Sequence, residues 1–408
     1  MRKIPPPPWI EEQPTQALLA ALRGAGIAAR FVGGCVRDAL LAPGSDRAIA
    51  DIDLATPSRP EEIVAALAKA GIRTVPTGLA HGTVTAMVPP RHFEITTLRR
   101  DVETFGRRAR VAFDADWAED AARRDFTMNA IYLDPDGTLY DPVGGLADLA
   151  ARRVRFVGEP ARRIAEDVLR VLRYYRFTAR FGGGDRDPAA RAACRAAVPL
   201  LPKLSGERVA QELIGLLAVA DPLPALRMMA ADAVLAAILP EANRLDRLAR
   251  LIALEPVADP LRRLAALVAV DGVGAAGLAK RLRLPRAGRD RLVRLAPLWP
   301  VDPSATPGAQ RRALYRLGAE RYRDLALLVA ADGGMSETRL KKLLALAAGW
   351  KPPVFPLAGR DVTALGIPPG PRVGQLLAEL RAWWEDGDFA TGRAECLKRL
   401  KELARVAG

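Results

Sequence analysis

Two aspartates separated by a single residue, Asp51 and Asp53, are the first pair in the chain whose spacing could do chemistry. In a β-strand, residues two apart project from the same face, so we expect both carboxylates to lie side by side. Two adjacent carboxylates repel unless a cation lies between them, and oxygen ligands suit Mg²⁺. Such pairs also occur by chance on solvated strand faces, so the pair alone is weak evidence.

A glycine pair ahead of these acids strengthens the interpretation. Gly33 and Gly34 separate an expected strand at 27–32 from an expected helix at 36–41 that carries Arg37. A strand that ends in two glycines and enters a helix exposes backbone N–H groups that bind phosphate. A simple turn is the alternative. If the turn does bind phosphate, its combination with the paired carboxylates indicates phosphoryl or nucleotidyl transfer.

The amino-acid composition narrows the class of protein and the kinds of site that are possible. The chain has 408 residues, 50% of them hydrophobic and 26% charged, which is typical of a globular protein with room for several domains. Its formal charge of +14 suits a polyanionic partner. A genome composition that favours arginine codons could give the same excess of positive charge. Two histidines and three scattered cysteines exclude multi-histidine metal centres and argue against a disulfide framework. We expect no membrane span and a cytoplasmic location.

The elements that must position these residues change character along the chain. The first third mixes further expected strands with helices, one of which has Thr15 as its N-cap; the segments are 15–23, 51–56, 61–69, 83–88 and 92–98. Residues 101–124 are charged and irregular, and we expect a mobile loop or a weak helix. From about residue 161 only helical spacing persists, at 164–179, 206–217, 224–229, 261–268 and 373–383.

Six ordered motifs from residue 31 to 213 resemble the class II branch of the nucleotidyltransferase superfamily that contains DNA polymerase β; they read GGCVRDALL, DIDLAT, RRDFTMNAIYLD, DPVGGLADL, EDVLRVLRYYRF and ERVAQEL. The resemblance implies an α+β protein with a polymerase-β-like head and an all-helical neck, body and tail. The expected division is 1–26 leading segment, 27–150 catalytic head, 151–220 neck, 221–300 RNA-binding body and 301–408 tRNA-binding tail.

The resemblance also implies roles in the head. Asp51 and Asp53 would hold two Mg²⁺ ions, while Gly34 and Arg37 would bind the triphosphate. Arg124 would contact nucleotide phosphate and Asp125 the ribose. Glu94, on the expected strand at 92–98, is a further acid that could lie near the metals, although a solvated strand-edge position is the simpler reading.

Nucleobase choice would fall to one expected helix of the neck. Asp167, Arg170, Arg173 and Arg176 follow each other at intervals of three. Cytosine and adenine both present an amino donor beside a ring-nitrogen acceptor, so one fixed acceptor and one fixed donor select both bases. By resemblance, Asp167 and Arg170 form this template, and Arg173 and Arg176 support it or reach the triphosphate. The alternative is an ordinary salt pair on an exposed helix. Glu207-Arg208 would brace this helix from a neighbouring one.

The family comprises enzymes that add CCA to tRNA lacking its 3′ end, with CTP and ATP as substrates, and bacterial poly(A) polymerases. We expect CCA addition without a nucleic-acid template. A poly(A) polymerase or an enzyme restricted to CC or A addition shares every motif, and a non-catalytic RNA-binding protein on the same scaffold is an alternative of another class. The sequence does not give the oligomeric state.

Overall fold

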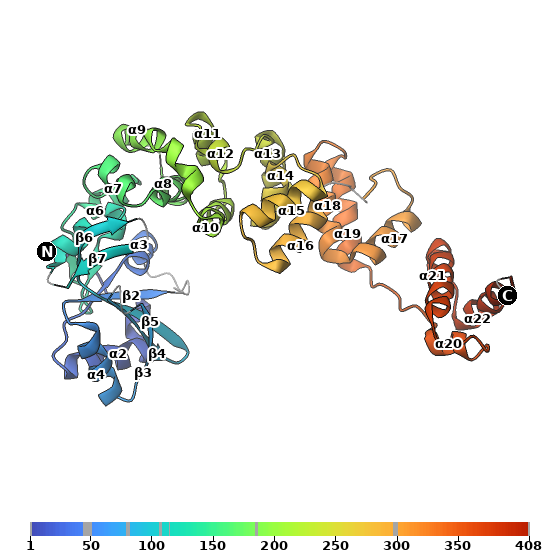
Figure 1. Cartoon of the computed structure of the whole chain (residues 1–408), viewed down its shortest axis with the longest axis horizontal. Helices are drawn as coiled ribbons and strands as arrows, with labels where there is room; N and C mark the ends of the chain where they lie inside the picture. Colours follow the sequence, from blue (N-terminus) through green and yellow to red (C-terminus); the bar gives the residue numbers. More distant parts are fainter. Residues whose placement is uncertain are drawn as a thin grey trace. The chain divides into compact units, whose positions relative to one another are not determined.

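The computed structural model describes residues 2–43, 51–78, 82–105, 108–113, 115–183, 187–296 and 301–406. The backbone divides into two compact units, Met1–Pro240 and Glu241–Gly408 (Figure 1). The first unit carries the β-sheet, and the described part of the second is helical. The expected fold class, an α+β head followed by helices, is therefore confirmed. Within the described ranges, no helix combines the length and apolar character needed to cross a membrane.

A seven-stranded mixed sheet forms the centre of the first unit, in the order β3-β4-β5-β2-β1-β8-β9 (Figure 1). Strands β2 and β5 run parallel, and the other neighbours are antiparallel. The bounds are β1 Arg30–Val32, β2 Ile52–Thr56, β3 Arg73–Gly78, β4 Thr83–Val88, β5 Arg91–Thr97, β8 Tyr132–Leu133 and β9 Leu139–Tyr140. The four strands expected from alternation lie at the middle of this sheet.

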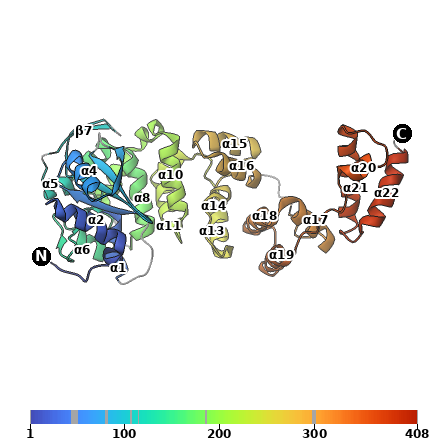
Figure 2. The same cartoon turned by 90° about the horizontal axis from the view of Figure 1, so that it is seen from below.

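Helices cover the sheet on both sides. Helix α4 (Pro60–Lys69) packs against β3 and β4, α2 (Gln13–Gly24) packs against α4 and β4, and α3 (Gly34–Leu41) packs against β1 and β2. Figure 2 shows α2 and α4 together, and Figure 1 shows them on the side of the sheet opposite α3. Helix α4 begins at Pro60, one residue before the expected segment, because proline needs no N–H donor in the first turn.

Two helical expectations near the N-terminus need correction. Thr15 is not an N-cap: it lies inside α2, where its buried hydroxyl donates to the carbonyl oxygen of Trp9 at 2.7 Å. Trp9 belongs to a preceding helix, α1 (Pro8–Glu11), and its ring meets Phe31 of β1 edge to face. The leading segment is thus part of the head's core, because its aromatic side chain has a partner in the sheet.

The segment expected to be irregular, 101–124, contains regular structure. Strand β6 (Arg100–Phe105) pairs antiparallel with β7 (Arg108–Ala112) in a separate two-stranded sheet. Helix α5 (Trp117–Ala122) follows, and Asp116 caps it by accepting a hydrogen bond from the backbone N–H of Glu119 at 2.8 Å. The expectation was wrong because hairpin pairing satisfies the backbone without requiring an alternating apolar pattern.

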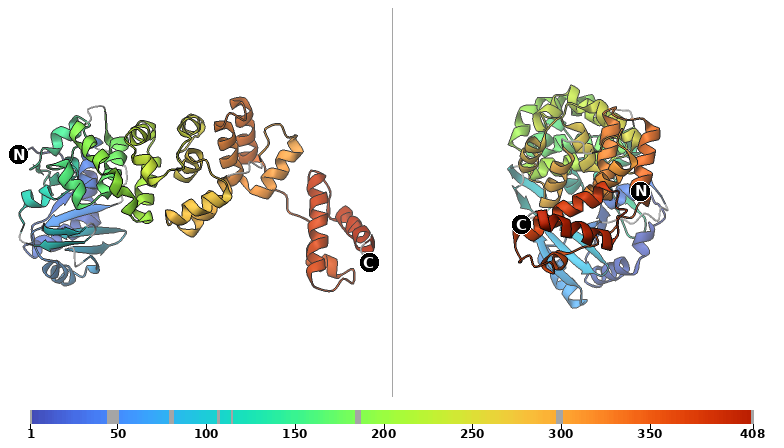
Figure 3. Two further views of the ribbon diagram at one scale, coloured as in Figure 1. Left: turned by 45° about the horizontal axis from the view of Figure 1, so that its top comes forward. Right: turned by 90° about the vertical axis from the view of Figure 1, so that its right-hand side faces the viewer.

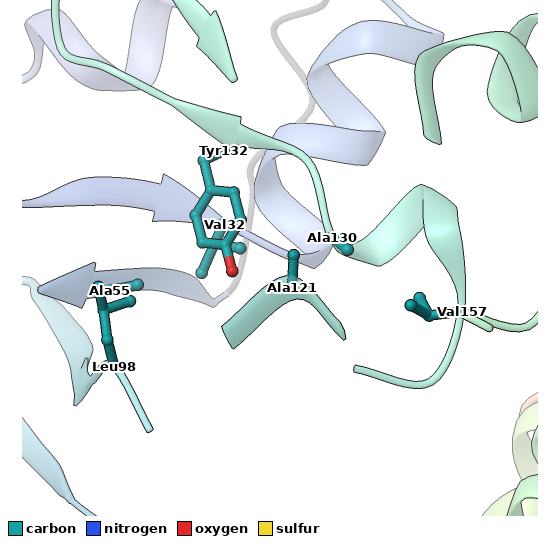
Figure 4. Packing of buried hydrophobic residues seen from close by; sticks show 7 residues of the cluster. All are labelled: Val32, Ala55, Leu98, Ala121, Ala130, Tyr132 and Val157. Atoms are coloured by element: carbon teal, nitrogen blue, oxygen red, sulfur yellow. The ribbon is translucent and has the colours of Figure 1, made fainter. Parts of the chain in front are cut away.

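A core cluster joins the sheet to these helices, with members Val32, Ala55, Leu98, Ala121, Ala130, Tyr132 and Val157. Figure 4 shows Tyr132 of β8 beside Val32 of β1, with its hydroxyl directed toward the helix that carries Ala121. Val32 and Asp53 are register partners, so this cluster lies on the same face of the sheet as Asp53. An apolar core cluster therefore lies on the face of the sheet that carries Asp53.

The remaining helices of the first unit follow the head. They are α6 Gly145–Ala150, α7 Pro160–Glu166, α8 Leu169–Phe181, α9 Pro188–Ala196, α10 Gly206–Leu217, α11 Leu223–Ala231 and α12 Val234–Ile238, with 3₁₀ turns η2 Thr127–Asn129 and η3 Val198–Lys203. The single helix expected at 164–179 is in fact two. Asp167 has extended backbone angles between α7 and α8, and its carboxylate accepts from the N–H of Leu169 at 3.1 Å.

The second unit consists of helices over its described residues: α13 Leu245–Leu254, α14 Pro260–Leu267, α15 Gly272–Arg281, α16 Arg286–Leu295, α17 Pro307–Leu317, α18 Ala319–Ala331, α19 Glu337–Gly349, α20 Gly359–Thr363, α21 Pro371–Asp386 and α22 Arg393–Val406. Helices α20, α21 and α22, red in Figure 3, pack around the buried Trp384. That side chain is therefore a core residue.

Candidate active site

Three acidic residues gather where β2 and β5 run side by side. Asp53 in β2 is the register partner of Glu94 in β5, and both strands run parallel. Asp51 lies one residue before β2, with its side chain 79% exposed and one oxygen 3.7 Å from Nε2 of His92. Asp53 is partly buried, so it is the enclosed member of the group.

Burial raises the pKa of the Asp53 carboxyl to about 6, and the negative charge of Glu94 adds to this effect. The guanidinium of Arg124 opposes it, while Asp51 contributes in the same direction as Glu94. Such crowding of negative charge favours a bound cation. No three histidine, cysteine or acidic side chains in the described ranges converge enough to hold a metal by themselves. The oxygen-only donor set nevertheless suits Mg²⁺ whose remaining ligands come from substrate and water.

The turn between β1 and α3 lies over Asp53. Gly33 has φ +79°, a left-handed conformation that favours glycine, and it occupies the N-cap position of α3. A β-carbon at Gly33 would lie 3.6 Å from Oδ2 of Asp53 and 4.0 Å from Nη1 of Arg124. The glycine turn, the enclosed aspartate and an arginine therefore meet at one point, as their chemistry requires.

Arg37, expected in the phosphate-binding turn, is only 5% exposed. Its guanidinium packs 4.2 Å from the ring of Phe181 and pairs with Asp38 at 2.7 Å. Burial lowers the pKa of Arg37, against the opposing effect of Asp38. A β-carbon on Gly34 would meet Nη2 of Arg37 at 3.6 Å, so the charge lies directly beneath the start of α3.

Arg124 is held by an aspartate that the sequence did not single out. Asp120 of α5 is 1% exposed and accepts from Nε and Nη2 of Arg124 at 3.2 and 3.0 Å. The same carboxylate accepts from Arg123 and from the hydroxyl of Tyr132, the latter at 2.7 Å. Burial alone would raise the pKa of Asp120, but the two guanidinium groups hold it below its usual value. The third nitrogen of Arg124, Nη1, is the one near the Gly33 turn.

Asp125 joins the head to α8. Its Oδ2 accepts from Nε and Nη2 of Arg173 at 2.8 and 2.6 Å, and its Oδ1 accepts from the amide of Asn129 at 3.0 Å. Arg173 also lies 3.6 Å from Glu212 of α10, and Glu212 accepts from Arg176 as well. Two of the expected neck arginines therefore converge on one buried glutamate, which the motif ERVAQEL contains but which its pattern did not distinguish.

The expected template pair, Asp167 and Arg170, has a different arrangement from the one predicted. Asp167 lies in the break before α8 and forms an ion pair with Arg208 of α10. Arg170 lies on α8 and donates to Glu166 at 2.6 Å and to the carbonyl oxygen of Arg163 at 2.7 Å. The four-residue ladder on one helix is therefore wrong for Asp167, since the extended residue starts a new helix. Arg208, which was expected to brace this helix, forms its ion pair with Asp167 in the break before α8, so its bracing role stays a prediction.

Comparisons with known proteins agree with the family resemblance of the sequence motifs. Residues 29–155 match the family described as the Poly A polymerase head domain, and residues 187–245 match the probable RNA and SrmB-binding site of polymerase A. The mitochondrial CCA tRNA nucleotidyltransferase 1 of Danio rerio is 33% identical over 91% of this chain and 87% of its own length. The chain belongs to the class II nucleotidyltransferase family.

Two bacterial CCA-adding enzymes are similar over nearly the full length. The CCA-adding enzyme of Limosilactobacillus fermentum is 31% identical over 97% of this chain and 98% of its own length. The crystal structure of the Bacillus stearothermophilus CCA-adding enzyme in complex with CTP has a TM-score of 0.77 and 30% identity, and it covers 97% of this chain and 99% of that one. The resemblance therefore extends from the nucleotidyltransferase head into the helical second unit.

Proposed function

We propose that the protein is a CCA-adding tRNA nucleotidyltransferase, which completes tRNA 3′ ends with CTP and ATP and uses no nucleic-acid template. The observation that carries the proposal is the meeting of Asp53, the Gly33 turn and Arg124 at the ends of two central strands, β1 and β2. In the reaction, the tRNA 3′-oxygen forms a bond to the α-phosphorus, and the bond from that phosphorus to the leaving pyrophosphate breaks. Positioning and charge neutralisation supply most of the catalysis in such transfers.

Asp51 and Asp53 are the residues that would hold Mg²⁺. Two bound ions would neutralise the triphosphate and lower the pKa of the attacking hydroxyl. The chain's own contribution is to enclose Asp53 beneath the Gly33 turn while Asp51 stays exposed to an incoming substrate. Glu94 lies opposite Asp53 and strengthens the demand for positive charge there, which supports its inclusion in the site.

Nucleotide phosphate and sugar would be bound by residues that are already fixed before substrate arrives. Gly34 is the first residue of α3, where a backbone N–H would donate to phosphate as helix N-terminal groups do. Arg37, being buried, would contribute its charge from below, whereas Nη1 of Arg124 would reach phosphate directly. Asp125 would accept from a ribose hydroxyl.

Base choice would rest on Asp167 and Arg170. The Asp167 carboxylate accepts from Arg208 and from the N–H of Leu169, so both bonds orient it. Arg170 is oriented by Glu166 and by two backbone carbonyl oxygens. An acceptor and a donor held in this way would match the amino group and ring nitrogen shared by cytosine and adenine. Arg173 and Arg176, both tied to Glu212, would support the pair from the next turns of α8.

Two alternatives remain open to experiment. A poly(A) polymerase, or an enzyme that adds only CC or only A, would use the same head. A non-catalytic RNA-binding protein is disfavoured because both aspartates and the glycine turn are present together.

A cytoplasmic location also stays a prediction, because the Danio rerio relative is named as mitochondrial.

A single experiment distinguishes these functions. The protein is incubated with Mg²⁺ and with tRNA that lacks its last three, two or one nucleotides, and each NTP is supplied alone and in combination. We expect C addition to the two shorter substrates, A addition only after CC, and no extension of complete tRNA. A long A ladder would indicate poly(A) synthesis, a product that stops at CC or needs CC would indicate partial addition, and no product would leave an RNA-binding role.

A further inference from the structure

We propose that Phe181, the last residue of α8, is a positioning residue for triphosphate binding: its ring holds the guanidinium of Arg37 beneath the first turn of α3. This inference rests on the proposed function, because it assigns a task within nucleotide binding. Phe181 does not need to touch the nucleotide, since it would act through Arg37. The helix that carries Arg170 would thereby also take part in binding the phosphates.

The ring of Phe181 contacts two guanidinium groups. The central guanidinium carbon of Arg37 lies 4.2 Å from the ring centroid, and that of Arg180 lies 4.9 Å from it. Both distances are short enough for a cation–π interaction, in which the negative face of a ring attracts a positive charge. Phe177, one helical turn earlier on the same side of α8, has its ring centroid 5.4 Å from Arg37. Two rings of α8 therefore attract one charge on α3.

Polar partners fix the direction of the Arg37 side chain. Its Nη1 donates to Oδ1 of Asn129 at 2.7 Å, its Nε donates to Oδ1 of Asp38 at 2.8 Å, and its Nη2 lies 2.7 Å from the same carboxylate oxygen. A β-carbon at Gly34 would lie 3.6 Å from Nη2. All three nitrogens are thus engaged, and the charge lies directly below the turn where a phosphate would bind.

The balance of charge explains why an aromatic ring is useful at this point. Asp38 is shared, because Nη2 of Arg180 lies 3.2 Å from its second carboxylate oxygen. Burial lowers the pKa of Arg37, Asp38 opposes this effect, and the positive charge of Arg180 adds to the lowering. One carboxylate therefore serves two guanidinium groups. The ring of Phe181 offers partial negative potential to both without adding an ion that would repel phosphate.

The burial of Phe181 argues against a purely space-filling role. The other aromatic residues of α8, Tyr174, Tyr175 and Phe177, are at most 5% exposed, whereas Phe181 is only partly buried. A partly exposed position at a helix end has no need for a large apolar side chain. Leucine would cover much of the same apolar surface, so the property that only an aromatic residue supplies here is the face of the ring.

The test measures equilibrium binding of CTP, CMP and UTP, with Mg²⁺ and without tRNA, by wild-type protein and by Phe181→Leu. We expect CTP affinity to fall by about fivefold in the variant, because Arg37 loses its cation–π partner and its charge is held less firmly below the phosphates. The affinity for CMP should fall less, because CMP carries less negative charge. The CTP-to-UTP ratio should not change, because Asp167 and Arg170 lie at the opposite end of α8.

Three further variants separate positioning from folding. Phe181→Tyr keeps the ring face and should restore CTP affinity. In an Arg37→Gln background the CTP-to-CMP ratio is already lowered, and adding Phe181→Leu should not change it further. Phe355→Leu makes the same substitution at a ring of the second unit that Arg381 contacts at 5.1 Å, and it should leave all three affinities unchanged.

Three results would overturn the proposal. They are unchanged CTP affinity in Phe181→Leu, an equal fall in affinity for CTP and CMP, and a Phe181→Tyr variant that binds CTP as weakly as Phe181→Leu. A changed CTP-to-UTP ratio would likewise overturn it, because it would show that the substitution distorts α8 as a whole.

Failure of the proposed function gives a different result. If Phe181→Leu lost CTP affinity as expected but wild-type protein added nothing to tRNA, nucleotide transfer would be refuted and the role of Phe181 would stand. If wild-type protein added CCA but Phe181→Leu bound CTP as tightly as wild type, CCA addition would stand and the role of Phe181 would be refuted.

Discussion

Asp53 and Glu94 occupy opposed register positions on the parallel strands β2 and β5, so their carboxylates share one face of the sheet. Parallel neighbours of like charge repel, and here the repulsion adds to burial in raising the pKa of Asp53 to about 6. The protein therefore keeps an unfavourable charge at its centre in the absence of a cation. That cost has measurable consequences for stability and for activity.

The first prediction concerns stability. Above pH 6 the Asp53 carboxyl is ionised in the folded and in the unfolded protein, and its buried charge destabilises the folded protein. Below pH 6 the folded protein binds a proton at Asp53, whereas the unfolded protein, with a pKa near 3.8 for this group, does not. Asp53→Asn removes the charge, so it should raise the free energy of unfolding at pH 7.5 by about 2 kcal/mol. The gain should shrink as pH falls through 6 and vanish near pH 4. Thermal melts in EDTA at several pH values measure this.

Asp51→Asn is the matched control, because Asp51 is exposed and precedes the strand. Its effect on the free energy of unfolding should be within about 0.5 kcal/mol at every pH. A stabilisation by Asp53→Asn that did not depend on pH would show that the charge of Asp53 is not its cause.

The second prediction concerns catalysis. Asp51→Ala or Asp53→Ala should abolish nucleotide addition, because each loss removes a metal ligand that is worth several kcal/mol in the transition state. Binding of tRNA to the same variants, measured by gel shift or anisotropy, should remain within about twofold of wild type. Full activity in either variant would remove the metal assignment. Loss of tRNA binding would point to misfolding instead.

The third prediction concerns base selection. Wild-type protein should incorporate CTP and ATP and hardly use UTP or GTP, because the Asp167 carboxylate would face a carbonyl oxygen on the latter bases. Such a mismatch costs about 1–3 kcal/mol, or roughly tenfold to a hundredfold in selectivity. Asp167→Ala should lose this selectivity as well as rate. Single-nucleotide incorporation with all four NTPs measures both quantities.

Arg208→Ala tests whether the ion pair with Asp167 matters for that selection. We expect a smaller loss of selectivity than in Asp167→Ala, because the acceptor remains but is less well oriented. Asp53→Ala should lower the rate for all nucleotides equally. Wild-type rate and selectivity in Asp167→Ala would leave Asp167 as a structural ion-pair partner of Arg208.

The fourth prediction concerns Asp120, which holds two nitrogens of Arg124. Asp120→Asn should raise KM for both CTP and ATP by about tenfold, because a neutral amide orients a guanidinium less firmly than a carboxylate does. In an Arg124→Ala background the same change should have little further effect on KM. Independent, additive effects would mean that Asp120 supports the fold and not Arg124.

The fifth prediction concerns tRNA. The charge of +14 implies that binding releases counterions from tRNA phosphates, so affinity should fall steeply with salt. Even two neutralised phosphates would weaken binding by roughly tenfold between 50 and 200 mM salt. Affinities for several tRNAs of different sequence should fall in parallel, since a helical surface would read backbone and shape. A salt-independent affinity would contradict this interpretation.

Local pattern was enough to predict the parts of the site that are close in sequence. The strand that carries Asp53 and the turn at Gly33 before α3 are set by strand periodicity and by positive φ. Motif order then identified the family. These features need only neighbours along the chain, so the sequence by itself determined them.

The tertiary structure decided which side chains of the site form hydrogen bonds and ion pairs with each other. Arg173 meets Asp125 across 48 residues, Asn129 meets Arg37 across 92, and neither pair follows a local period. Asp167 leaves the helix because its carboxylate binds the N–H of Leu169, and its ion pair goes to Arg208, 41 residues away, instead of Arg170. Hydrogen bonds and ion pairs act over a few ångströms. Only the packing of α3, α8 and α10 around the head brings these groups within that range.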